Sequence, residues 1–158
     1  MEPTPRIDGP GDAPLVTAHV DLSCPDCALA VHRLTNAGVR IDLRHFVVRA
    51  RGEPARRAAL AAEAAGNQDA FWPFARGLLH DLGRQDPPHL WALAESLGLD
   101  VDRFERDRRA ETGQDRIAQE TRAALVGGAA GIPAVFVDTA AADYLRQSGY
   151  DADVRIRS

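Results

Sequence analysis

The sequence LVTAHVDLSCPDC, residues 15–27, decides the fold of this chain. Its first part, residues 15–22, alternates apolar and other side chains with a period of two, which predicts a β-strand with one buried face. Cys24 and Cys27 follow three positions apart and are the two cysteines of the chain. Pro25 suits the first turn of a helix, because the N–H that proline lacks has no partner there. The stretch therefore predicts a strand that leads through a cysteine pair into a helix.

The segment after the cysteine pair completes a strand–helix–strand unit. Leu29, Ala30 and Leu34 recur at helical spacing, and residues 36–38 (Asn-Ala-Gly) indicate the helix end. Residues 40–49 alternate again and predict a second strand, which a crossover through the helix would place parallel to the first. The first cysteine then stands at a helix N-terminus, where unpaired N–H groups and the helix dipole favour a thiolate over a thiol.

The spacing of Cys24 and Cys27 favours redox chemistry over a structural role. A disulfide between them would close a very short loop and remove little entropy from the unfolded chain. Two cysteines alone cannot complete a zinc site, which takes four ligands, so we expect no metal and no cofactor beyond the disulfide itself. Cys24 is predicted to be the nucleophile, and Cys27, one helical turn later and better shielded, the resolving cysteine. A structural disulfide, a metal-binding pair and an inert pair stay as alternatives.

Asp26 lies between the two cysteines, and two interpretations of it stay open. As a tuning residue, its carboxylate would repel the Cys24 thiolate and make the disulfide less oxidising than a motif with histidine in that place. Alternatively, it is a solvated acidic residue that favours the helix N-terminus. The reduction potential of the Asp26→His variant would distinguish the two.

Composition excludes several classes of function. The chain has 158 residues, of which 45% are hydrophobic and 27% are charged, as expected for one soluble globular domain. The net charge of -4 offers no basic surface for nucleic acid, and no apolar run reaches the ~18 residues of a membrane span. Residues 1–14 contain four prolines and no signal-like apolar run, which predicts a flexible leader and a cytoplasmic location. Residues 15–158 are expected to form the single domain.

The second half of the chain predicts a helical block followed by a strand. Apolar stripes at helical spacing, separated by glycines and prolines, mark several helices over about residues 54–127. Residues 131–137 then read Gly-Ile-Pro-Ala-Val-Phe-Val, and a proline before such a run suits the first position of a strand. The tail after Asp138 stays open between a hairpin partner, at about residues 142–146, and a helical turn.

These features together resemble the DsbA-like branch of the thioredoxin superfamily. The resemblance covers about residues 15–138, and Arg44-His45-Phe46 and Phe71-Trp72 match further patterns of that family. It implies an α/β, thioredoxin-like fold with a helical insertion between the βαβ unit and the C-terminal strand, in which five helices cover one face of the sheet. The chain is similar in particular to DsbA-like domains that occur with bacterial sodium/proton antiporters.

The resemblance also implies a site and its partners. Pro133 would be a cis proline beside the cysteine pair, and the backbone of Ile132 would pair with an extended substrate segment. The implied partners are proteins with thiols or disulfides, or low-molecular-weight thiols. We expect no direct membrane insertion, and an association with a membrane transporter is a further expectation.

The sequence also departs from the family pattern. The family often carries a glutamate six positions before the first cysteine, where this chain has Ala18. His19, next to it, could serve as the proton relay instead, or it could be a hydrogen-bonded strand residue. The family's C-terminal helix is expected to be truncated or absent after Asp138.

The predicted function is that of a thiol–disulfide oxidoreductase with a Cys-Pro-Asp-Cys motif. The alternative is a redox-sensing or non-catalytic binding and regulatory domain that keeps the thioredoxin-like fold. A third interpretation, a glutathione-transferase-like isomerase, fits less well, because those relatives use serine in place of a cysteine pair. Loss of disulfide exchange in a Cys24→Ser variant would favour the first.

Overall fold

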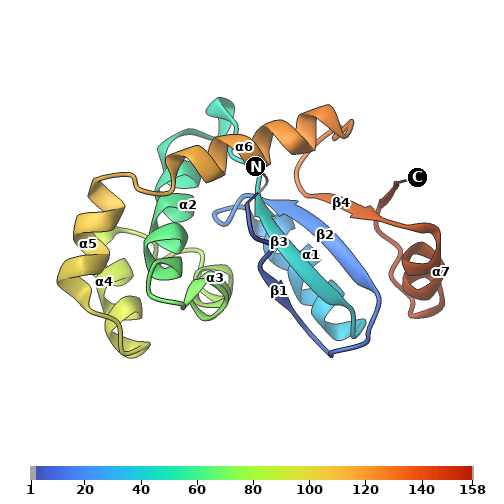
Figure 1. Ribbon diagram of the computed structural model, residues 1–158, viewed down its shortest axis with the longest axis horizontal. Helices are drawn as coiled ribbons and strands as arrows, with labels where there is room; N and C mark the ends of the chain where they lie inside the picture. The colour runs from blue at the N-terminus through green and yellow to red at the C-terminus, as the bar shows by residue number, and fades with distance from the viewer. Residues whose placement is uncertain (1–2, 158) are drawn as a thin grey trace.

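A computed structural model describes residues 3–157 and shows a twisted sheet with helices against it and beside it (Figure 1). The sheet has five strands in the order β1-β3-β2-β4-β5. Within residues 3–157, no helix combines the length and the apolar character that crossing a membrane would require. The α/β, thioredoxin-like architecture expected from the sequence is confirmed.

The strand order places the predicted strand–helix–strand unit at the centre of the sheet. β2 (Leu15–Val20) runs parallel to β3 (Arg40–His45) and antiparallel to β4 (Ala134–Val137). The edges are two short strands, β1 (Ile7–Asp8) beside β3 and β5 (Arg155–Ile156) beside β4. A motif at the end of β2 therefore lies between two neighbouring strands and is held on both sides.

Helix α1 (Pro25–Asn36) follows β2 and covers one face of the sheet. α1 packs on this face because every second side chain of β2 points toward the helix and enters the core below it, as the alternation in the sequence predicts. This core unites Val16, Ala18 and Val20 of the strand with the buried side of α1, formed by Cys27, Val31 and Leu34.

The insertion between β3 and β4 begins with a 3-10 helix, η1 (Arg49–Arg51). Five α-helices follow: α2 (Gly52–Gly66), α3 (Phe71–His80), α4 (Pro87–Ser96), α5 (Val101–Arg109) and α6 (Gln114–Val126). The five were expected to cover one face of the sheet, but α2 to α5 form a lobe beside it (Figure 1). Only α6 returns over the sheet, where Ala124 packs with Phe46, Ala134 and Phe136.

The expectation of a flexible leader is wrong for residues 6–8. β1 pairs antiparallel with β3, and Trp72 Nε1 donates a hydrogen bond to the Arg6 carbonyl at 2.9 Å. The Arg6 side chain forms an ion pair with the buried carboxylate of Glu63. Arg6 is held in place because a buried carboxylate such as that of Glu63 requires a charged partner. β1 can add to β3 because an open sheet edge readily accepts a further strand. A two-residue strand has no period for a sequence pattern to reveal.

A C-terminal helix follows Asp138, so the expectation that this helix could be absent is wrong, whereas its truncation stays a prediction. α7 (Thr139–Gln147) follows β4, and Asp138 caps it by accepting the N–H of Ala141 at 2.7 Å. Residues 142–146 lie within this helix, so the helical alternative for them is confirmed and the hairpin alternative is wrong. α7 joins the core below α1 through its buried residues Ala141, Ala142 and Leu145.

Candidate active site

The cysteine pair lies at the start of α1, as the sequence predicts. Cys24 is the N-cap residue, with an extended backbone (φ −97°, ψ 126°), and Pro25 follows at the first helical turn. Both cysteines are free thiols. Cys24 keeps 6% of its surface exposed and Cys27 keeps none, so an incoming disulfide reaches Cys24 first.

The buried thiol of Cys27 is held by the end of β2. The backbone N–H of Asp21 donates a hydrogen bond to Cys27 Sγ over 3.4 Å. Burial raises the pKa of the Cys27 thiol well above its ordinary value, and the neighbouring Cys24 adds to the rise, whereas the Asp21 N–H opposes it. Cys27 therefore keeps its proton at neutral pH.

The turn that presents Cys24 is built around the buried carboxylate of Asp21. One carboxylate oxygen accepts the backbone N–H and the hydroxyl of Ser23, at 2.8 Å and 2.6 Å. The other accepts Arg51 Nε of η1 at 3.0 Å. The backbone carbonyl of Asp21 accepts the Cys24 N–H at 3.1 Å. Asp21 thus connects both cysteines to the start of the helical insertion.

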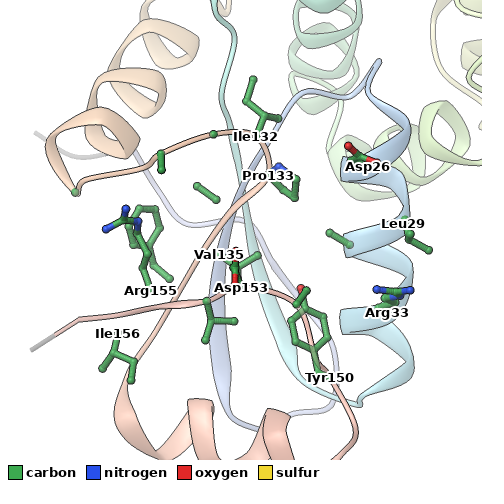
Figure 2. Close-up of a pocket in the computed structure, with 18 of the residues that line it drawn as sticks. Asp26, Leu29, Arg33, Ile132, Pro133, Val135, Tyr150, Asp153, Arg155 and Ile156 are labelled. Carbon is green, nitrogen blue, oxygen red and sulfur yellow. The ribbon is translucent and has the colours of Figure 1, made fainter.

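The structure brings Asp26, Ile132 and Pro133 to one groove of about 1000 Å³. Figure 2 shows the loop with Ile132 and Pro133 on one side and α1, with Asp26 and Leu29, on the other. The segment with Tyr150, Asp153, Val154 and the edge strand β5 forms a further wall. The Ile132–Pro133 peptide bond is cis, the form that the family resemblance implies.

One half of β4 faces this groove with an open edge. β5 pairs with Phe136 and Val137 only, whereas Ala134 and Val135 pair with β2 on their inner side and line the groove. The backbone of an extended segment could therefore add beside the loop before β4.

His19 lies on the opposite face of the sheet from the cysteines. Its ring packs edge-on against Phe136, with centroids 5.6 Å apart, in the layer below α6. Its neighbour Ala18 points into the core that contains Cys27. His19 Nδ1 lies 3.4 Å from the His45 carbonyl oxygen, and burial lowers the pKa of His19 to about 4. The geometry favours the hydrogen-bonded strand residue over the proton relay.

Sequence reasoning missed a second cluster of titratable side chains, at the end of β3. His45 Nε2 lies 2.9 Å from Glu63 Oε2, and Glu63 also pairs with Arg6. Burial raises the pKa of Glu63, but the bonds from His45 and Arg6 outweigh it and lower that pKa to about 2. The sequence signal that could have revealed this cluster is Glu63, an acidic residue among the buried alanines of α2.

Residues 38–150 match the family described as the DSBA-like thioredoxin domain. The chain belongs to this DsbA-like family. The matched range begins after the cysteine pair. The match therefore supports the fold and the helical insertion, whereas the role of the cysteine pair is argued from its geometry alone.

Solved structures agree with the DsbA-like assignment. A thioredoxin-like oxidoreductase from Silicibacter pomeroyi DSS-3 superposes with a TM-score of 0.75 at 25% identity, over 96% of this chain and 95% of that one. BdbD from Bacillus subtilis superposes with a TM-score of 0.72 at 20% identity, over 91% and 90% of the two chains. At 20% identity, the similarity to BdbD supports the fold alone.

Curated relatives of the DsbA-like chain are named as antiporters. Na(+)/H(+) antiporter NhaA 1 of Salinispora arenicola is 36% identical over 139 residues, which is 84% of this chain and 21% of the relative. The NhaA antiporter of Herminiimonas arsenicoxydans is 36% identical over 144 residues, 85% of this chain and 23% of the relative. The chain thus spans about a fifth of the length of these relatives.

Proposed function

We propose that this DsbA-like chain is a thiol–disulfide oxidoreductase that exchanges disulfides with protein or small-thiol partners. The observation that carries the proposal is the asymmetry of the pair. Cys24, at the N-terminus of α1, keeps 6% of its surface exposed, whereas Cys27 is fully buried and holds its proton. A sulfur at a helix N-terminus that an incoming disulfide reaches first, paired with a fully shielded thiol, suits a two-step exchange.

In the first step, the Cys24 thiolate attacks one sulfur of a substrate disulfide. A mixed disulfide forms, and one substrate sulfur leaves as a thiolate. In the second step, Cys27 loses its proton and attacks the Cys24 sulfur. The Cys24–Cys27 disulfide forms, and the second substrate sulfur leaves and takes up a proton. The substrate disulfide is reduced and the protein dithiol is oxidised; the reverse sequence oxidises a substrate dithiol.

The groove between α1 and the loop before β4 suits an extended peptide as substrate. Its walls offer Ile132 and Pro133 on one side and the half-open edge of β4, at Ala134 and Val135, next to them. Backbone pairing at such an edge gives affinity without demanding a particular sequence. Low-molecular-weight thiols would use the same groove.

A second candidate function is redox sensing or regulation attached to a transporter. Two points favour it: Ala18 stands on the cysteine side of the sheet, where the family resemblance implies a glutamate, and the curated relatives are named as antiporters. Association with a membrane transporter is therefore part of the proposal. The cytoplasmic location expected from the sequence stays a prediction, which fractionation of cells that produce the full-length protein would check.

Insulin reduction and refolding of a scrambled disulfide protein test the proposal. We expect Cys24→Ser to abolish both activities, since no nucleophile remains. Cys27→Ser should accumulate a mixed disulfide at Cys24, visible as a covalent adduct by mass spectrometry. If wild type and both variants behave alike in both assays, the oxidoreductase proposal is wrong and the regulatory one is favoured.

A further inference from the structure

The ion pair between Arg51 and Asp21 lies directly beside the cysteine pair. Arg51 Nε donates to Asp21 Oδ2 at 3.0 Å, and the Asp21 backbone N–H donates to Cys27 Sγ at 3.4 Å. The Asp21 side chain is completely buried, whereas the Arg51 side chain keeps 41% of its surface exposed. The guanidinium therefore reaches from solvent to a carboxylate that has no access to water.

A buried carboxylate in this position opposes the reduced form of the pair. A thiolate at Cys24 adds a second negative charge close to Asp21, and like charges destabilise each other most where water is excluded. The disulfide form carries no such charge. The balance between the two forms therefore depends on what neutralises Asp21.

Arg51 is the cation placed to do so. Its pKa is raised first by the hydrogen bond to Asp21, next by the charge of Asp21, and further by a negative charge at Cys24. Asp26, the other acidic residue of the turn, is exposed to solvent, where its charge is better screened.

We propose that Arg51 is a positioning residue for the redox pair: by cancelling the buried charge of Asp21, it stabilises the dithiol form with a Cys24 thiolate and raises the reduction potential. The inference rests on the proposed oxidoreductase function and extends it. Arg51 lies outside the cysteine motif, 30 residues from Asp21 in sequence, at the first turn of the helical insertion. The insertion thus takes part in setting the redox chemistry.

The experiment measures the equilibrium of the pair with a series of glutathione and glutathione disulfide ratios at one fixed pH. Two reduced glutathione molecules convert the protein disulfide to the dithiol and leave as glutathione disulfide. For Arg51→Gln we expect a shift of about tenfold toward the protein disulfide, equivalent to a potential ~30 mV more negative.

Three further variants separate electrostatics from folding. Arg49→Gln removes the same charge from the same 3-10 helix and should leave the equilibrium unchanged, because Arg49 is exposed and makes no contact with Asp21 among the bonds of residues 3–157. Arg51→Lys keeps the charge and should restore most of the wild-type potential. Asp21→Asn combined with Arg51→Gln removes both charges and should return the equilibrium toward wild type.

The outcomes are distinct. A merely structural role of Arg51 would weaken the reduced and oxidised proteins equally, lower the melting temperature and leave the potential unchanged. That result, or an equal shift in Arg49→Gln, overturns the inference while the proposed function stands. A wild-type pair that cannot be cycled between dithiol and disulfide overturns both.

Discussion

The backbone N–H of Asp21 points at the Sγ of Cys27 across 3.4 Å, so the end of β2 holds the buried thiol that would complete the proposed disulfide exchange. This contact stabilises a thiolate at Cys27, but burial has the larger effect and raises the pKa of that thiol. The two sulfurs of the motif are thus prepared for different steps by the same turn.

The raised pKa of Cys27 predicts that the resolving step accelerates with pH. Only the thiolate attacks the mixed disulfide, so its rate should grow by about tenfold per pH unit from neutral to alkaline pH. The measurement is the single-turnover release of a small chromophoric thiol from a mixed disulfide preformed at Cys24. A rate that is already constant at neutral pH would contradict this prediction.

Asp26→His is expected to raise the reduction potential of the pair. The substitution removes an anion next to the Cys24 thiolate and places a potential cation there, which favours the dithiol form. Because Asp26 is exposed in the first turn of α1, stability should change little. Asp102→His, in the exposed first turn of α5, is the matched control and should leave the potential unchanged. No rise in Asp26→His would favour the merely solvated interpretation of Asp26.

The lowered pKa of His19 predicts that the protein loses stability in mild acid. This pKa falls from 6.5 to about 4 on folding. As the pH falls, His19 therefore takes up a proton in the unfolded chain before it does so in the folded protein. The full stability is present above pH 6.5, and up to about 3 kcal/mol is lost as the pH falls toward 4. Urea unfolding of His19→Leu should lack this slope, whereas the exposed His80→Leu should keep it. Disulfide exchange by His19→Leu should be unimpaired, because this side chain faces away from the cysteines.

Glu63→Gln is expected to destabilise the protein by about 3 kcal/mol at neutral pH, because it removes the anion that Arg6 and His45 share in the interior. The lowered pKa of Glu63 gives the pH window. Its contribution is present above the ordinary value of 4.5 and is lost as the pH falls from there toward 2. Chemical denaturation checks both statements, with the exposed Glu95→Gln of α4 as control. A Glu63→Gln protein as stable as wild type would contradict the network's role.

Local patterns sufficed for the central unit of the fold. The alternation of residues 15–22, the proline after Cys24 and the Val-Phe-Val run after Pro133 predicted β2, α1 and β4, because hydrophobic periodicity and helix-start signals act over a few residues. The same patterns did not reveal β1, since a two-residue strand has no period, and they left α7 undecided between a hairpin partner and a helical turn.

The chemistry around the motif was settled only by packing. The sequence alone determined that Cys24 and Cys27 share a helix start, one turn apart, and that a proline-led strand follows much later. Tertiary structure decided that His19 faces away from the pair, that Ile132 and Pro133 share a groove with Asp26, and that Arg51 neutralises Asp21. The physical reason is distance along the chain: these contacts join residues far apart in sequence, and burial and charge pairing at such contacts arise only once the sheet and its insertion are assembled.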